Sequence, residues 1–446
     1  MELFSNHSRL KYYIRKIKEH TMKKAFKILA VLVSAALLFA GCAQPVPQEG
    51  NSETESPAQT EVKDAVMLSL ADAVPESPEA MRDLQLAFNL ALLKSLNSSQ
   101  EGNLFYSSMS INAAMTMAYF GADGQTQKEI ADALGYGDMD MTQVAAYQKY
   151  LLQSYEDPGD TTFTIANSMW IDDLFSAKQD YVDTMKDVFD TKVTTLDLQG
   201  EEAVGELNQW IDESTNGMIE KLFEESDNPF KDTAMVLMNA IYFNGKWTAP
   251  FDPDRTFEKQ FNGASNTSNV DMMSSDDEVM GYEGDGYMSA RLPYGDDERF
   301  AMIAVLPDDM EAFIAGLSED SLHDVLTTFE QQDEVMLQLP VFEMEQKVTL
   351  NDTLKSLGIV QAFEKEEADL SRISDEPIYI GDVMHKAKIK VDEEGTEAAA
   401  VTSVQVTLES MPLDRFEFVA DKPFLFFIMD TENDLVLFTG KVDDLG

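Results

Sequence analysis

Residues Glu393 to Ser410 read E-E-G-T-E-A-A-A-V-T-S-V-Q-V-T-L-E-S, and the spacing of apolar positions in this stretch decides the fold. The preceding segment, Val383 to Val391, alternates between a mostly apolar face at odd positions and a face that carries lysines, which is typical of a half-buried strand. From Thr396 onward the apolar and small residues fall at even positions. The change of parity at Asp392 to Gly395, where glycine tolerates turn geometry, predicts a β-hairpin.

The first part of the second arm, Thr396 to Thr402, consists almost entirely of small or β-branched residues. Small side chains suit a segment that slides between strands already in place. An acid-capped alanine helix over Glu393 to Thr402 is the alternative. The β-branched residues Val401, Val404 and Val406 disfavour that helix.

The composition places the chain among large, acidic, globular proteins. Its 446 residues are 44% hydrophobic and 26% charged, which is enough to bury an extensive core in one large domain or two. The net charge is −48, from 33 basic and 81 acidic residues. Binding to nucleic acid or to anionic lipid through a basic face is therefore not expected, and the charge favours a soluble monomer.

The N-terminus carries the features of an export signal. Three lysines, the last of them Lys27, precede a short apolar run from Ile28 to Ala40, which fits a signal-peptide core and is too short to span a bilayer. The run ends L-F-A-G-C at Cys42, which resembles a bacterial lipobox, with Phe39 where leucine is usual. We expect residues 1–41 to be a signal peptide and Cys42 to carry a lipid, with ordinary secretory cleavage nearby as the alternative. The first 21 residues precede a second possible start at Met22.

Residues 42–76 are rich in Pro, Gln, Glu, Ser and Thr, and we expect a flexible tether from a lipid anchor to a folded domain over residues 77–446. This organisation predicts a protein that is secreted across the cytoplasmic membrane and held at the cell surface by its lipid alone.

The rest of the chain mixes helical and strand patterns without an internal repeat, which predicts one α+β domain with several sheets. Helices are expected after Ser77, after Ser108, and after a capping box at Thr126 to Glu129, and then over Ala177–Phe189, Ala203–Glu213, Asp309–Phe329 and Leu350–Leu357. Strands are expected over Phe163–Ile171, Lys192–Leu198, Val236–Phe243, Arg299–Leu306, Val335–Phe342, Val383–Val391, Phe416–Ala420 and Phe424–Thr439, the last broken by a turn at Asp430–Asp434.

The residues needed for most enzyme mechanisms are missing. Cys42 is the only cysteine, which excludes disulfides within the fold and a cysteine nucleophile. Beyond residue 41 the histidines are His323 and His385, and neither accompanies a nucleophile motif. We interpret His385 as a hydrogen-bonded core residue and His323 as a solvated one.

Metal and cofactor motifs are also missing. The acidic runs at Asp276 to Glu278 and Asp296 to Glu298 lack the ligand spacing of a calcium loop, and two histidines without a thiol do not suit zinc. No glycine-rich phosphate loop is present. We therefore expect no catalytic residue, no metal and no cofactor, and a hydrolase that uses paired carboxylates is the least favoured hypothesis.

Many motifs in a fixed order resemble those of the serpin family over residues 82 to 443. They are N-L-F-Y-S-S-M-S-I at Asn103, G-A-D-G-Q-T-Q-K-E-I at Gly121, I-A-N-S-M-W at Ile165, L-N-Q-W at Leu207, N-A-I-Y-F-N-G-K-W at Asn239, L-P-Y at Leu292, V-L-P at Val305, H-K-A at His385, P-F-L-F at Pro423 and L-F-T-G at Leu437. The stretch E-E-G-T-E-A-A-A-V-T is similar to the hinge of inhibitory members. Two residues depart from the family pattern, Ser108 where proline is usual and Thr439 where methionine is common.

The resemblance implies a single large domain with several mainly antiparallel sheets, eight or nine helices and an exposed reactive loop. The implied hinge comprises Glu393, Glu394, Gly395, Thr396, Glu397, Ala398, Ala399, Ala400, Val401 and Thr402. The implied sheet-opening region contains Ser107, Asn239, Trp247 and His385. Counting along the loop from Gly395 puts the reactive bond at Glu409-Ser410, with Leu408 and Met411 as alternatives.

The resemblance also implies a mechanism, in which a target serine protease cleaves the loop and forms an acyl bond. The loop then inserts into the main sheet and traps the protease in a covalent complex. We therefore expect the hairpin to be the state after cleavage, with Thr396 to Leu408 outside the sheet beforehand. A non-inhibitory binding protein of the same fold is the alternative.

Overall fold

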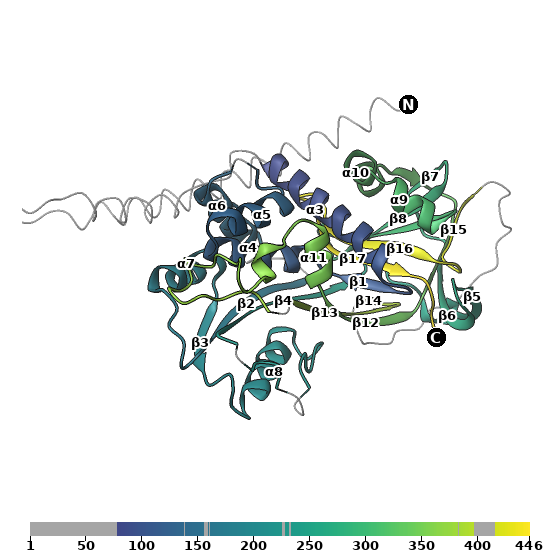
Figure 1. Ribbon diagram of the computed structural model, residues 1–446. Coiled ribbons are helices and arrows are strands. Elements are labelled where there is room, and N and C mark those ends of the chain that lie inside the picture. The colour runs from purple at the N-terminus through teal and green to yellow at the C-terminus, as the bar shows by residue number, and fades with distance from the viewer. Residues whose placement is uncertain are drawn as a thin grey trace, which may run out of the picture. The chain divides into compact units, whose positions relative to one another are not determined.

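The computed structural model describes residues 78–137, 139–155, 159, 161–224, 228–231, 233–381, 383–396 and 415–446, which belong to one compact unit that begins at Val62. The α+β class expected from the sequence is confirmed, and the described residues form nine α-helices and three β-sheets (Figure 1). The helices are α3 (Pro78–Ser99), α4 (Ser108–Gly121), α5 (Gly124–Ala133), α6 (Met141–Ser154), α7 (Gln179–Phe189), α8 (Ala203–Ser214), α9 (Met310–Gly316), α10 (Glu319–Thr327) and α11 (Asn351–Ser356). Two short 3-10 helices cover Pro253–Arg255 and Gln361–Phe363. None of the helices in these ranges has the length and apolar character needed to span a bilayer.

The six-stranded sheet carries the candidate site. Its strands, in spatial order, are β12 (Phe342–Thr349), β13 (Met384–Asp392), β14 (Gly395–Thr396), β4 (Met235–Lys246), β2 (Thr162–Asp172) and β3 (Lys192–Leu196). All neighbours are antiparallel except β2 and β3. α4 and α7 cover one face and α8 covers the other (Figure 1), because apolar residues alternate along β2 and β4 between the two faces.

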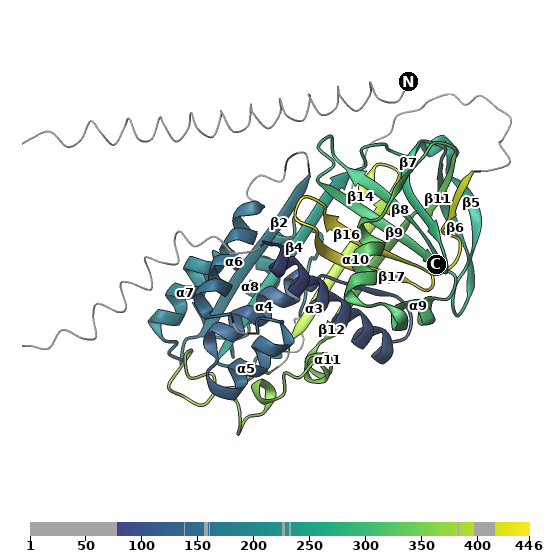
Figure 2. The same cartoon turned by 90° about the horizontal axis from the view of Figure 1, so that it is seen from above.

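The other two sheets pack beside the first around a core rich in phenylalanine (Figure 2). The seven-stranded sheet has the order β1 (Leu104–Tyr106), β17 (Leu435–Val442), β16 (Phe424–Asp430), β9 (Phe300–Pro307), β8 (Tyr287–Tyr294), β7 (Val279–Gly284) and β10 (Glu330–Gln332). The four-stranded sheet has the order β15 (Phe416–Val419), β11 (Val335–Pro340), β6 (Thr267–Ser275) and β5 (Phe257–Asn262). Every residue of β9, β16 and β17 is buried, which explains why these strands are continuous apolar runs.

Most elements expected from the sequence are found within a few residues of their predicted bounds, but three expectations were wrong or incomplete. The helix expected over Asp309–Phe329 is two helices, because Ser318 caps the second in a capping box with Ser321. α5 starts three residues early, capped by Asp123, and Thr126 is buried inside it. The helix α6 and the strands β1, β5 to β8, β10 and β12 were not predicted.

Candidate functional site

The hinge begins with a tight turn that confirms the change of parity. Asp392 pairs with Gly395, and Val391 pairs with Thr396, so a two-residue turn joins β13 to β14. On its other edge β14 pairs with β4, Gly395 opposite Lys246 and Thr396 opposite Gly245. The start of the hinge is therefore a strand between β13 and β4.

Four residues from distant parts of the chain hold this turn, and we call Trp247, Phe251, Thr256 and Tyr294 the hinge clamp. The amides of Trp247 and Phe251 each donate a hydrogen bond of 2.9 Å, to the carbonyls of Glu394 and Glu393 respectively. The Trp247 indole Nε1 donates to the Asp392 carbonyl at 2.9 Å. The Thr256 hydroxyl donates to Glu393 Oε1 at 2.6 Å.

Tyr294 completes the hinge clamp from inside the core. Its hydroxyl lies 2.7 Å from Thr396 Oγ1, and its ring stacks on Trp247 with the ring centroids 4.5 Å apart. Burial raises the pKa of Tyr294 far above its ordinary value, so the hydroxyl stays protonated and can donate. Thr396 itself is only 2% exposed.

The position of Thr396 corrects one expectation. We expected Thr396 to Leu408 to lie outside the sheet before cleavage, but Thr396 is already paired on both sides. The small side chain and the hydrogen bond between the Thr396 and Tyr294 hydroxyls make this burial favourable in the uncleaved chain. The remaining predicted hinge residues, Glu397 to Thr402, and the candidate reactive bonds between Leu408 and Met411 lie outside the described residues.

Gly395 and Gly245 allow the backbones of β14 and β4 to approach closely. A Cβ atom on Gly395 would lie 2.2 Å from the carbonyl oxygen of Gly245, which is far inside van der Waals contact. A Cβ atom on Gly245 would lie 2.9 Å from the ring of Tyr294. Space therefore requires a glycine at both positions, and Gly395 also has a φ of 158°, which other residues rarely adopt.

A small pocket continues from Thr396 between β4 and β13, and we call it the slot. It is lined by Ile241, Tyr242 and Phe243 of β4 and by Lys388 and Ile389 of β13. Met218 and Ile219 border it on the face that α8 covers, and Phe105, Ile428 and Phe438 border it on the core face. In the described part of the chain, β14 lies between β4 and β13 and pairs with both of them.

The predicted core role of His385 is confirmed. Its Nε2 accepts a hydrogen bond of 3.1 Å from the amide of Ser107, the residue that caps α4. This contact brings together two of the predicted sheet-opening residues. Burial lowers the pKa of His385 to about 4, so the ring is neutral at neutral pH and its Nε2 can accept.

Asn239 lies on the same face of β4 as Ile241 and Phe243, and it is farther than they are from the end of β4 that pairs with the hinge. Its Nδ2 donates to Asn167 Oδ1 at 2.7 Å, while its own buried Oδ1 has no partner in the part of the chain that the structure describes. Trp247, the fourth predicted residue, lies at the hinge end of β4 instead. Sequence reasoning missed Phe251, Thr256 and Tyr294. Tyr294 belongs to the L-P-Y motif, but its role is visible only when β8 and β14 are placed together.

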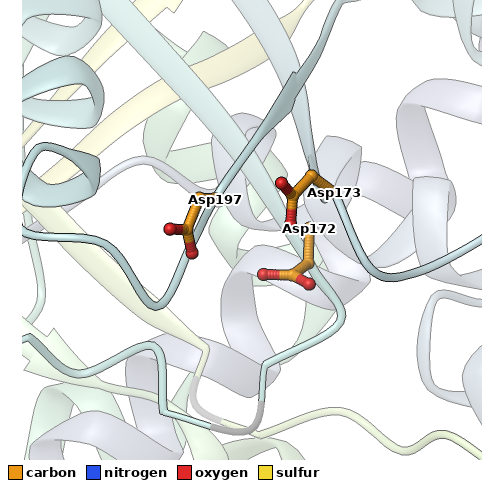
Figure 3. Close-up of side chains that lie close together, drawn as sticks. All are labelled: Asp172, Asp173 and Asp197. Carbon is orange, nitrogen blue, oxygen red and sulfur yellow. The ribbon is translucent and has the colours of Figure 1, made fainter.

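A cluster of three aspartates that the sequence analysis did not single out has a structural role. Asp172, Asp173 and Asp197 lie close together where β2 and β3 end (Figure 3). The buried Asp172 carboxylate already accepts hydrogen bonds from the amides of Leu174 and Leu198, at 3.0 and 3.1 Å, so it closes the turn between these segments. His323 was expected to be solvated, but its Nε2 is buried without a partner among the described residues.

The comparison with known families agrees with this arrangement. The profile described as Serpin (serine protease inhibitor) matches residues 83–445. The chain belongs to the serpin family. Iripin-5 of Ixodes ricinus is 36% identical over 393 residues, which cover 85% of this chain and 98% of that protein.

Solved serpin structures share the fold. The native state of the thermophilic serpin tengpin aligns with a TM-score of 0.74 and 27% identity, over 89% of this chain and 98% of tengpin. Thyroxine-binding globulin in complex with thyroxine aligns with a TM-score of 0.72 and 26% identity, over 82% and 99% of the two chains. Membership of the serpin family places the chain in a family of protease inhibitors rather than enzymes.

Proposed function

We propose that this serpin inhibits a serine protease by reactive-loop cleavage, acyl-enzyme trapping and insertion of the loop into the six-stranded sheet. The observation that carries the proposal is β14, because the start of the hinge already forms a strand between β4 and β13. The protease supplies the catalytic serine in this scheme. The inhibitor itself then needs only a loop that can be cut and a sheet that can accept it.

The register of β14 tells where further residues would lie. Extending it by two residues would set Ala398 between Phe243 and Ile389, at the slot. Two more would set Ala400 between Ile241 and Ala387. Small side chains at these positions fit, because the core face is already filled by aromatic and branched residues.

The same register would set Thr402 between Asn239 and His385. The unpartnered Asn239 Oδ1 is an acceptor, and a threonine hydroxyl is a donor. Leaving a buried acceptor unpaired costs about 1 to 3 kcal/mol, which insertion of Thr402 would recover. Among the described residues this acceptor is unpaired, and insertion of Thr402 would complete its hydrogen bond.

The length of β4 limits how far insertion can proceed. In the same register Val406 would lie opposite Met235, the first residue of β4. Burial of Val404 and Val406 would add about 1.5 to 3 kcal/mol each. Cleavage at Glu409-Ser410, or next to Leu408 or Met411, would leave all of these residues free to insert.

The test is incubation with a panel of serine proteases, followed by denaturing electrophoresis. We expect a covalent complex with at least one protease, and a released C-terminal fragment whose first residue identifies the bond. Separately prepared cleaved protein should melt at a higher temperature than the intact protein. Cleavage by every reactive protease without any covalent complex would refute inhibition.

A second candidate function is ligand binding without inhibition, favoured by the similarity to thyroxine-binding globulin in complex with thyroxine. Cleavage of the loop without a gain in melting temperature would support this candidate, because the loop would then not insert.

We also propose that the protein is a bacterial lipoprotein, exported by residues 1–41 and anchored through Cys42. This proposal rests on the lipobox-like sequence, which lies outside the described residues. In cells, replacing Cys42 with alanine should move the protein from the membrane fraction to the soluble fraction. Unchanged fractionation of C42A would argue against the anchor.

A further inference from the structure

One edge of β2 is only partly covered by a neighbouring strand. β2 pairs with β4 from Thr162 to Ile171, but β3 covers the opposite edge only from Ser168 to Asp172. The residues from Thr162 to Ala166 therefore have a strand neighbour on one side alone in the described part of the chain. α6 and α7 lie beside this edge (Figure 2).

The hydrogen bonds at the end of β2 reveal which backbone groups point toward the open edge. The Asp172 amide donates to Ala234, at the β4 side, and the Asp173 amide donates to Leu196, at the β3 side. Backbone groups alternate in direction along a strand. The N–H and C=O groups of Phe163 and Ile165 therefore point to the open edge, and no described residue forms a hydrogen bond with them.

A cleft of 770 Å³ lies along this edge, within the usual range for a binding site. α6 contributes Leu152 to its lining, the residue that follows α6, Tyr155, also lines it, and α7 contributes Val188. Thr161, which is 2% exposed, lines the cleft next to the open edge and carries a buried hydroxyl without a partner among the described residues. The cleft thus combines unpaired backbone groups, an unpaired hydroxyl and an apolar wall.

The two faces of β2 determine the pattern of side chains that an added strand would need. Phe163 and Ile165 lie on the helix side, while Thr162 and Thr164 are exposed on the opposite face. Paired residues of neighbouring strands point to the same face. An added strand would place apolar side chains beneath α6 and α7, and small polar ones beside the two threonines.

The charges around the cleft favour an uncharged occupant. Lys149 is paired with Asp187 at 2.9 Å, and the cleft also has one further lysine, Lys186, and one further aspartate, Asp190. These charges balance locally, in a chain whose net charge is −48. A cationic peptide would be attracted to the whole surface, whereas this lining gives it no added advantage.

We propose that the open edge of β2 binds an extended, uncharged segment of a partner protein, about five residues long, in which β-branched apolar and small polar residues alternate. The segment adds as a strand in line with β3, and its backbone pairs with Phe163 and Ile165. This interaction is independent of loop cleavage, since the loop's acceptor strands are β4 and β13.

The test uses the full chain and a fluorescein-labelled six-residue peptide that alternates threonine and valine. Fluorescence anisotropy should show saturable binding, which a copy of the peptide N-methylated at every residue abolishes. Ile165→Pro removes the outward N–H, and Ile165→Ala is the matched control that removes the side chain but keeps the N–H. We expect the proline variant to bind about tenfold more weakly than the alanine variant.

Hydrogen exchange on the wild-type protein keeps the test decisive if the proline variant fails to fold. Bound peptide should protect residues 161–167 and leave β13 unchanged. Protection of β13 instead would place the peptide in the slot and overturn the proposal, as would the absence of binding at about 1 mM peptide. If residues 161–167 become protected without peptide as the protein concentration rises, that result would assign the edge to a second copy of the chain and would also overturn the proposal.

Discussion

The side chain of Thr396 is already enclosed in the uncleaved protein. It is 2% exposed, its hydroxyl contacts Tyr294, and Gly245 lies opposite it on β4. A longer or charged side chain at this position would have to be desolvated or would push β14 out of the sheet.

Thr396→Arg should therefore convert the inhibitor into a substrate, because insertion cannot start from a buried arginine without a counter-charge. The covalent complex should disappear while cleavage of the loop continues, as measured by the stoichiometry of inhibition. Thr396→Ser, which keeps the hydroxyl, is the control and should inhibit as the wild type does. Full inhibition by T396R would show that insertion does not pass through this position.

His385 makes the stability of the fold depend on pH. Its pKa is about 4 in the folded state against an ordinary value of 6.5, because it is buried. The stabilising effect of the neutral ring is complete above pH 6.5, is lost as the pH falls from 6.5 to about 4, and does not change further below that. The loss is about 3 kcal/mol, from the size of the pKa shift.

His385→Gln should remove this contribution, because the glutamine carbonyl can accept from the Ser107 amide but does not titrate. The free energy of unfolding, measured by denaturant between pH 7 and pH 4, should fall less in the variant than in the wild type. Equal losses in both proteins would mean that the pKa of His385 is the same in the folded and unfolded states.

At the scale of the elements, the sequence pattern was sufficient to predict a strand wherever one face of the strand is buried and the other is not. The alternation in Val383 to Val391 defined β13 closely, and the change of parity placed the hinge turn correctly. It could not show that Thr396 is already paired in the uncleaved chain. That placement depends on Tyr294 and Gly245, whose proximity to Thr396 is a tertiary contact.

Other elements were missed for identifiable physical reasons. Thr126 has the composition of a capping box, but Asp123 competes for the cap three residues earlier, and the buried Thr126 hydroxyl instead accepts from the amide of Asp369. β5 pairs with β6 in the four-stranded sheet, and β7 pairs with β8 in the seven-stranded sheet. These strands mix exposed and buried positions, so their periodicity is weak.

The extended register leads to a prediction about the cleaved form. Thr402→Val should leave the intact protein unchanged but reduce the gain in stability on cleavage by about 1 to 3 kcal/mol, because Asn239 Oδ1 would stay unpaired. Calorimetry of the intact and cleaved proteins measures this difference. Ser403→Ala, on the opposite face of the same strand, is the matched control and should not change the gain. Equal gains in T402V and the wild type would reject the register.

At the scale of the whole molecule, the net charge of −48 acts against the compact state through mutual repulsion of carboxylates. Raising sodium chloride from about 0.05 to about 1 M should therefore increase the melting temperature by several degrees, since the Debye length falls below the spacing of surface charges. A melting temperature that falls with added salt would mean that ion pairs such as Arg299 with the buried Asp430 outweigh the repulsion.

The pairing of Thr396 in β14 also matters for the rate at which the loop would insert. A strand that enters a sheet must first form one pair of contacts with each neighbour, and this first step carries most of the entropic cost of bringing the segment into place. In this serpin β14 has made those contacts already. Under the proposed mechanism the cleaved loop would only have to lengthen an existing ladder. Insertion would then start sooner, which would leave water less time to attack the acyl bond. Under that mechanism, the two glycines that let β14 lie against β4 would help insertion to precede hydrolysis of the acyl bond.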